Sequence, residues 1–276
     1  MVAKKINDKI YWLCYNIVIN VGIEQPINWR DYNMGKIVLE EKRLVFQRRD
    51  ELIVIEPYGE NCLRCRATRN NFVSEEKWTL LSPVTEDCCK IEGDESIATI
   101  TNGDISAKIE AGFPWYGGIV SFYRKGKQIL RRKYEGDYVN NYIHTEGDNY
   151  CTKVIFEANE GEHFYGLGQE TEDAFDRKGS TCNLVHYNTK SALPFLYSSL
   201  GYGFFWNNPS PGRCETTRNH ILWCSESCYQ ADFLVFAGDT PADVMKIYAD
   251  LTGYASKFPE WAAGYWQCKL RYEDQE

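Results

Sequence analysis

The chain has 276 residues, of which 43% are hydrophobic, 25% charged and 14% aromatic. This length and composition are typical of one large globular domain or two small ones. The formal net charge is −8 and the sequence has no basic run, so nucleic acids and anionic membrane surfaces are poor partners, whereas neutral ligands such as sugars remain open.

The first 35 residues are expected to form an N-terminal extension whose fold the sequence does not define. Lys4 and Lys5 precede a partly apolar run, as in a signal peptide, but Asn16 and Asn20 interrupt that run and no cleavage site follows. No stretch reaches the ~20 apolar residues that a membrane span needs. With eleven cysteines, an odd number, the sequence predicts a cytoplasmic protein with free thiols and no membrane partner.

Alternating apolar and polar residues run through most of residues 36–238 and predict a mainly β domain. Residues 35–68 contain three or four such runs. In the last of them, alternation places Leu63, Cys65 and Ala67 on one face of a strand and Arg64, Arg66 and Thr68 on the other. Many short strands with few helices predict a large antiparallel β-sandwich.

Two hairpins follow in chain order. The first, over residues 95–112, is expected to turn at Asn102-Gly103 in a type I′ turn. The second, over residues 117–130, is expected to turn at Lys125-Gly126-Lys127. Further strands are predicted at residues 153–158, 163–168, 193–199, 202–208, 220–226 and 231–238.

One helix is predicted within residues 239–258. Thr240 is a candidate N-cap, Pro241 suits the first turn, and Asp243 completes a capping box. Gly253 is expected in the left-handed conformation after the last turn. The core-facing stripe is expected to contain Val244, Ile247, Tyr248 and Leu251. Residues 263–270 then read as a fresh strand, so a further α/β domain is expected to begin near residue 259.

The cysteines raise the possibility of a zinc site. Cys62 and Cys65 have the spacing of a zinc knuckle, but the adjacent pair Cys88-Cys89 cannot provide the second one. Cys65 is also expected on an apolar strand face, where a thiol packs as a small hydrophobic group. No metal site and no cofactor are therefore expected.

The segment 165–179 combines glycines with acidic residues. Gly166 and Gly168 predict a bulge or close backbone packing. Paired carboxylates are what glycoside hydrolysis needs, but a run of acids beside Arg177 and Lys178 is more typical of a solvated loop. The acids in question are Glu170, Glu172, Asp173 and Asp176.

Four segments, in this order, resemble family 31 of the glycoside hydrolases. They are HFYGLGQ (residues 163–169), KGSTCNLVHYNTKSALPFLYSSLGYGFFWNN (178–208), DTPADVMKIYADLTG (239–253) and FPEWAAGYWQCKLRY (258–272). The resemblance is strong from about Asn102 to Tyr272 and weaker over residues 36–100.

The resemblance implies a galactose-mutarotase-like β-sandwich followed by a catalytic (β/α)8 barrel, of which residues 259–276 would be the truncated start. The family is retaining, and its nucleophile and acid/base are barrel aspartates that this chain would lack. The chain would then be the inactive N-terminal part of an α-xylosidase or α-glucosidase, whose role is to shape and cover the active site. Its partners would be an α-glycoside or oligosaccharide and the missing C-terminal barrel.

The resemblance also implies substrate-binding residues. A sandwich loop of the family reaches over the barrel mouth, and the matching positions here are Asn188 and Thr189. Some members carry an Arg-Asp pair there, so a sugar-binding aspartate is not carried over. The short form of this loop is similar to the α-xylosidase branch. Trp266 and Arg271 would lie near the floor of the pocket.

Two alternatives stay open. The first is a free-standing carbohydrate-binding β-sandwich module, against which the apolar strand at residues 263–270 argues. The second, a zinc-dependent regulatory domain, rests only on the number of cysteines. The same strand would leave Tyr265, Trp266 and Leu270 uncovered, so homo-oligomers are possible.

Overall fold

The computed structural model describes residues 35–83, 89–111, 117–133, 142–170 and 174–267. The chain divides into two compact units, residues 1–34 and 35–276, and all described residues belong to the second. The expected N-terminal extension thus lies almost wholly outside the described residues. Within the described ranges, no helix is both long and apolar enough to cross a bilayer.

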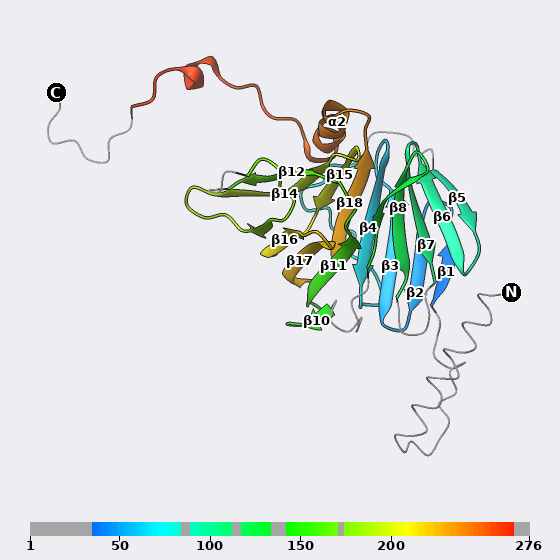
Figure 1. Ribbon diagram of the computed structural model, residues 1–276. Coiled ribbons are helices and arrows are strands. Elements are labelled where there is room, and N and C mark those ends of the chain that lie inside the picture. The colour runs from blue at the N-terminus through cyan, green and yellow to red at the C-terminus, as the bar shows by residue number, and fades with distance from the viewer. Residues whose placement is uncertain (1–34, 84–88, 112–116, 134–141, 171–173, 268–276) are drawn as a thin grey trace. The chain divides into compact units, whose positions relative to one another are not determined.

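Three antiparallel sheets make up most of the described structure (Figure 1). The largest has eight strands. Its members, in spatial order, are β1 (Lys36–Leu39), β2 (Leu44–Arg48), β3 (Glu51–Pro57), β4 (Cys62–Thr68), β18 (Ala231–Ala237), β15 (Tyr202–Trp206), β14 (Ser191–Ser198) and β12 (Phe164–Gln169).

The other two sheets have five strands each. One contains, in spatial order, β10 (Tyr142–His144), β11 (Tyr150–Glu157), β17 (His220–Cys228), β16 (Gly212–Thr216) and β13 (Thr181–Leu184). The other contains β5 (Cys89–Gly93), β6 (Ile97–Asn102), β7 (Ile105–Glu110), β8 (Ile119–Arg124) and β9 (Lys127–Arg131).

One apolar core joins all three sheets. Phe233 of β18 lies at its centre: its ring centroid is 6.1 Å from that of Phe122 in β8 and 5.8 Å from that of Phe156 in β11. Phe204 of β15 stacks on Trp223 of β17 at 4.8 Å. The smaller sheets therefore pack on the same face of the eight-stranded sheet, which confirms the predicted β-sandwich.

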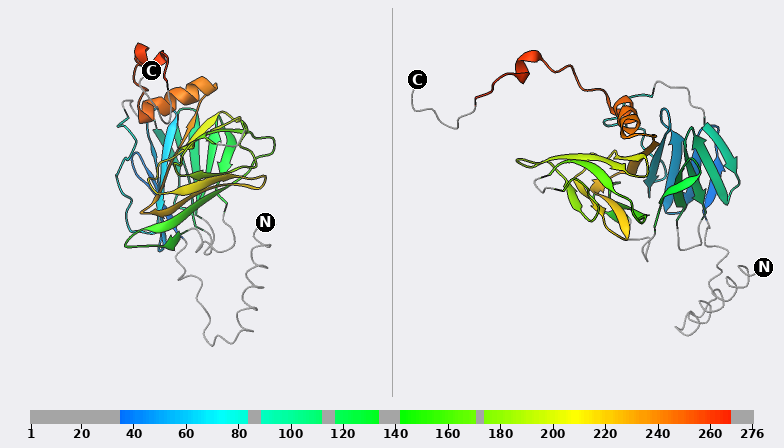
Figure 2. Two further views of the ribbon diagram at one scale, coloured as in Figure 1. Left: turned by 90° about the vertical axis from the view of Figure 1, so that its left-hand side faces the viewer. Right: turned by 45° about the horizontal axis from the view of Figure 1, so that its top comes forward.

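The opposite face of the eight-stranded sheet is covered in part by α2 (Pro241–Thr252), which Figures 1 and 2 show against the end of this sheet. Thr240 and Asp243 form the predicted capping box, and Val244, Ile247 and Leu251 are buried as expected. Gly253 has a φ of 103° and a ψ of 149°. It thus uses a backbone region open to glycine, but not the left-handed helical conformation that was expected.

The sequence prediction places the first hairpin turn one residue too early in the chain. Asn102 pairs with Ile105, so Gly103 and Asp104 are the central residues, and only Gly103 has a positive φ. A type I′ turn needs a positive φ at both. The cause is Asn102, which is buried and donates hydrogen bonds of 2.8 Å to the carbonyl oxygens of Gly59 and Cys62, so that it ends the strand.

The second hairpin turn has a positive φ at both central residues, as was expected of the first. Arg124 pairs with Lys127, and the central residues Lys125 and Gly126 both have positive φ, 47° and 80°. The Lys125 ammonium lies 2.6 Å from Asp239 and 3.2 Å from Asp104. Lys125 thus adopts a backbone conformation that usually favours glycine or asparagine.

The predicted strand at residues 263–270 does not form within the described residues. A short 3-10 helix, η2 (Glu260–Ala263), is followed by Gly264–Gln267 without strand pairing, and residues 268–270 lie outside the described part. A strand requires a hydrogen-bonded neighbour, and none is present beside these residues in the described structure. The pattern of apolar residues in the sequence cannot show whether such a neighbouring strand is present.

Candidate functional site

The candidate site is built on the paired strands β12 and β14, which extend beyond their neighbour β15. Ser191 and Ala192 of β14 pair with β12, whereas pairing with β15 begins only at Phe195 (Figure 1). The pairing shifts by a bulge between Gly166 and Gly168, as the glycines predicted. A Cβ at Gly168 would lie 2.0 Å from the Ser191 carbonyl oxygen, so the approach of the two strands requires glycine there.

A tight turn at residues 187–190 precedes β14. The Tyr187 N–H donates to the Lys190 carbonyl at 3.3 Å, and the Lys190 N–H donates to the Tyr187 carbonyl at 3.2 Å. Asn188 and Thr189 occupy the two central positions with both side chains exposed, and Thr189 has a φ of 68°. Tyr187 is 59% exposed. The turn therefore presents an amide, a hydroxyl and an aromatic ring to the surroundings.

An ion pair between Glu170 and Lys190 holds the base of this turn. Lys190 Nζ lies 2.6 Å from Glu170 Oε2, and the side chains are only 14% and 9% exposed. The register explains the pairing: Gln169 is opposite Ser191, so Glu170 and Lys190 are the next residues across the two strands. The second carboxylate oxygen, Glu170 Oε1, is buried and has no hydrogen-bond partner among the residues that the structure describes.

The acidic segment that follows β12 forms no catalytic pair among its described members. Glu170 is bound to Lys190, and the Asp176 carboxylate accepts hydrogen bonds from His163 Nδ1 at 2.6 Å and from the Phe164 and Lys178 amides. Burial raises the pKa of Asp176, but the hydrogen bonds from His163 and these amides outweigh it and lower that pKa overall. Asp176 thus stays ionised and structural. Glu172 and Asp173 lie outside the described residues.

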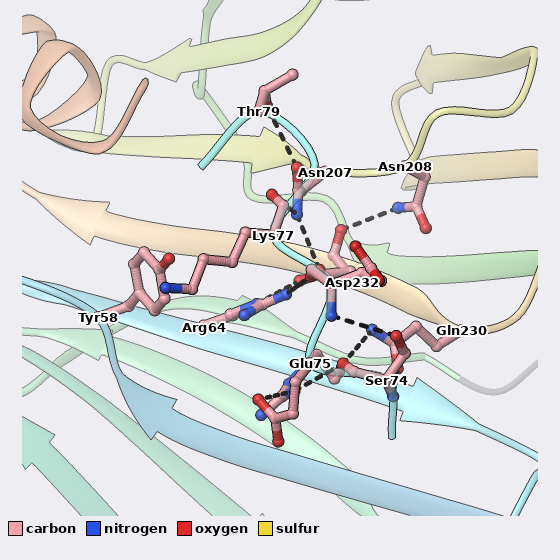
Figure 3. Close-up of polar contacts among 12 residues, drawn as sticks. Tyr58, Arg64, Ser74, Glu75, Lys77, Thr79, Asn207, Asn208, Gln230 and Asp232 are labelled. Carbon is pink, nitrogen blue, oxygen red and sulfur yellow. Dashed lines mark hydrogen bonds and ion pairs between the residues drawn. The ribbon is translucent and has the colours of Figure 1, made fainter. Parts of the chain in front are cut away.

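A second polar network lies on the outer face of the eight-stranded sheet and fixes residues 69–83, here called the strap (Figure 3). Arg64 and Asp232 form a buried ion pair between β4 and β18. Arg64 also donates to the Glu76 carbonyl at 2.7 Å, and the Ser74 amide donates to Gln230 at 2.8 Å. These polar groups bind one another and the strap. The network therefore has a structural role, which is to hold the strap in place.

The structure places the sequence-predicted site residues as follows. Asn188 and Thr189 lie together at the exposed turn. Trp266 is 66% exposed, donates from Nε1 to the Ala262 carbonyl at 3.0 Å and contacts the Trp261 ring at 5.6 Å. Arg271 lies outside the described residues. Within the described ranges, Trp266 makes no hydrogen bond or ring contact with Asn188 or Thr189.

Most of the described cysteines are buried in strands. Cys65 packs in the main core, the position its strand alternation predicted. Cys62 lies on the opposite face, in the cluster beneath α2. The two thiols of the knuckle-like spacing therefore point to different faces of β4. Over the described residues, no group of three or more His, Cys, Asp or Glu side chains is arranged to hold a metal ion.

Sequence reasoning missed the Glu170–Lys190 pair and the strap. The pair could have been found from the register of β12 and β14, but the bulge between Gly166 and Gly168 hides that register in the sequence. The strap has no periodic pattern of its own, because Arg64 and Arg66 hold it through the backbone carbonyls of Glu76 and Ser74.

The family model of the glycosyl hydrolase 31 N-terminal galactose mutarotase-like domain matches residues 52–215. The chain belongs to glycoside hydrolase family 31. This match covers β3 to β16, and so includes the strap, the bulged β12 and the Tyr187–Lys190 turn. The mainly β, galactose-mutarotase-like fold that the resemblance implied is therefore confirmed.

Family members of known name have similar sequences and structures. The chain is 31% identical over 266 residues to "uncharacterized family 31 glucosidase ORF2" of Pseudescherichia vulneris, covering 88% of this chain and 49% of that protein. It is 39% identical over 140 residues to an alpha-xylosidase of Saccharolobus solfataricus, covering 48% of this chain and 19% of that protein. The crystal structure of a family 31 α-xylosidase from a soil metagenome, complexed with xylose, superposes with a TM-score of 0.78 at 33% identity, covering 86% of this chain and 37% of that one. The chain thus spans about half or less of the length of these relatives.

Proposed function

We propose that these residues are the N-terminal part of a retaining α-glycosidase, and that the Tyr187–Lys190 turn contributes to its sugar-binding site. Family membership supports glycoside hydrolysis as the activity of the whole enzyme. The names of the similar α-xylosidases support an α-xyloside substrate ahead of an α-glucoside. One observation carries the role of the turn: Asn188 and Thr189 are exposed on a turn whose base is held by a largely buried ion pair.

The exposed groups of the turn match the chemistry of sugars. The Asn188 amide both donates and accepts hydrogen bonds, and the Thr189 hydroxyl does the same, as sugar hydroxyls require of their partners. Tyr187 offers an apolar ring beside them. Because Lys190 is bound to Glu170, the turn is fixed before a ligand arrives, and less conformational entropy is lost on binding.

The hydrolytic step itself is assigned to residues outside this chain. Retaining hydrolysis uses one carboxylate as nucleophile, which forms a glycosyl-enzyme intermediate, and a second that protonates the leaving oxygen and later deprotonates water. In the family these are barrel aspartates, so we propose that residues 1–276 alone do not hydrolyse glycosides. Trp266 and Arg271 are proposed to lie at the pocket floor once the barrel surrounds them, and residues 259–276 to be the beginning of that barrel.

The role of the turn is tested by substitution in the longer enzyme that contains these residues. Asn188→Ala and Thr189→Val each remove a hydrogen-bonding group without changing the ion pair. We expect each to lower kcat/KM for an aryl α-xyloside by about tenfold, the effect of ~1.4 kcal/mol. Asn71→Ala, which removes another exposed amide from the strap, is the matched control. Kinetics of Asn188→Ala and Thr189→Val equal to those of the control would refute the assignment.

The alternative of a free-standing sugar-binding module has its own measurement. Calorimetric titration of residues 1–276 with xylose and with a xylose-containing oligosaccharide would detect binding by the chain alone. The proposed function predicts no heat above that of dilution, because the turn supplies only part of the site. Saturable binding that Asn188→Ala abolishes would favour the module.

A further inference from the structure

The sheet formed by β10, β11, β17, β16 and β13 carries two pairs of cysteines, one on each face. Cys182 and Cys214 are directly opposite each other on β13 and β16, and both are buried in the main core. Cys151 of β11 and Cys224 of β17 lie on the outer face, where they pack with Ile155 and Leu222. None of these thiols forms a disulfide. The two pairs therefore differ in which side of the sheet they face.

The outer pair lies within one small apolar cluster and is reachable from solvent. Cys151 packs against the small buried cluster that contains Cys224. Cys224 is only 3% exposed, whereas Cys151 is partly exposed beside it. Burial, together with the neighbouring Cys151, raises the pKa of Cys224 to about 11. Cys224 therefore keeps its proton at neutral pH, and a reagent reaches Cys151 first.

The strand register favours a bridging atom between these sulfurs over a disulfide. Cys224 pairs with Lys153 and Cys151 pairs with Ile143, so the two cysteines are diagonal and not opposite neighbours. Diagonal residues on antiparallel strands are ~7–8 Å apart, beyond the usual reach of a disulfide with its sulfur–sulfur bond of about 2.05 Å. An atom bonded to both sulfurs spans a longer gap than a direct sulfur–sulfur bond does, so it suits this diagonal arrangement better than a disulfide.

We propose that Cys151 and Cys224 form a dithiol site for trivalent arsenicals, soft electrophiles that bond to two sulfurs at once. Thiolates are soft ligands and prefer such partners. With an arsine oxide, each sulfur forms a bond to arsenic, the arsenic–oxygen bond breaks, and the oxygen leaves as water with the two thiol protons. Arsenic stays trivalent, so no oxidant or reductant is needed. The product cross-links β11 to β17.

Phenylarsine oxide is the probe, and intact-mass spectrometry of residues 1–276 is the readout. The adjacent Cys88 and Cys89 could also bind the probe, so both are first replaced by serine to give the parent protein. We expect the parent to gain one phenylarsenic group per chain, removable by dithiothreitol. Cys151→Ser and Cys224→Ala should abolish this adduct, because a single thiol does not close the ring.

Cys182→Ser is the matched control, since it breaks the cysteine pair on the inner face of the same sheet. It should retain the full adduct. The thermal midpoint of each variant is measured beside its mass, so that loss of fold is distinguished from loss of the site. Cys151→Ala is the second variant if Cys151→Ser is unfolded. An adduct of unchanged stoichiometry in folded Cys224→Ala, or no adduct in the parent, would overturn the proposal. This result is independent of glycosidase activity.

Discussion

Arg64 and Asp232 form a two-point ion pair between neighbouring strands, with Nε 2.9 Å from Oδ1 and Nη2 2.6 Å from Oδ2. Their side chains are 2% and 1% exposed. Arg64→Met should lower the free energy of unfolding by ~3–5 kcal/mol, because the Asp232 charge stays buried without its partner. Urea unfolding followed by tryptophan fluorescence measures the loss.

A double variant separates the ion pair from the packing. Arg64→Met combined with Asp232→Leu removes both charges, so most of the lost stability should return, as it does when a buried pair becomes apolar elsewhere. Amide exchange in the strap should nevertheless stay faster, since Arg64 no longer donates to the Glu76 carbonyl. A double variant as unstable as Arg64→Met would show that the charges are not the cause.

The bulged contact between β12 and β14 predicts unequal effects of two glycine substitutions. Gly168 and Gly179 have nearly the same φ, 84° and 87°, but a Cβ at Gly179 meets nothing within 4 Å, whereas one at Gly168 meets the Ser191 carbonyl. Gly179→Ala should cost about 1 kcal/mol and Gly168→Ala on the order of 2–3 kcal/mol more, because only the latter displaces a strand. Thermal unfolding measures the stability of both variants. Equal losses of stability would show that only the strain in φ matters.

The Glu170–Lys190 pair predicts local order at the Tyr187–Lys190 turn. Lys190→Met leaves the Glu170 carboxylate largely buried without its cation, so amide exchange at residues 187–190 should accelerate at least about tenfold. Glu170→Gln should have a smaller effect, since its amide oxygen still accepts from Lys190. Lys246→Met, which breaks the exposed Lys246–Asp250 pair on α2, is the control and should leave the turn unchanged. Unchanged exchange in Lys190→Met would contradict the assigned role of the pair.

The lowered pKa of Asp176 predicts a pH dependence of stability. A carboxyl whose pKa is lower in the folded than in the unfolded state stabilises the fold above the unfolded value, 3.8 here, and that contribution is lost as pH falls through the folded pKa. Asp176→Asn should therefore be less stable than wild type at about pH 5, with the difference shrinking below about pH 4. The effect should be small, because Asp176 is partly exposed and solvent screens it. Unfolding curves in that range measure it, and a difference that does not change with pH would contradict the account.

The sequence predicts best where local chemistry decides the structure. Thr240, Pro241 and Asp243 encode the start of α2 within a few residues, and the structure forms the capping box as predicted. Strand alternation likewise places Leu63 and Cys65 in the core. Both features depend only on neighbours along the chain, so they can be read without knowledge of the fold.

Features that depend on distant residues were not predictable. Alternation places Arg64 on the opposite face of β4 from Leu63, but its burial depends on Asp232, 168 residues along the chain. The hairpin turn moved by one residue because Asn102 binds the carbonyls of Gly59 and Cys62. The site prediction had the same limit: Asn188 and Thr189 came from family resemblance, whereas the ion pair beneath them needed the register of two strands.

The most direct test of the central claim compares two polypeptides on one substrate. Residues 1–276 alone, and the longer enzyme proposed to contain them, are assayed with an aryl α-xyloside, and the anomer first released is identified by NMR. The account predicts no turnover above background from residues 1–276. From the longer enzyme it predicts hydrolysis with retention of configuration. Turnover by residues 1–276 that is abolished by Asp176→Asn or Glu170→Gln would contradict it, as would a longer enzyme that is inactive on both α-xylosides and α-glucosides.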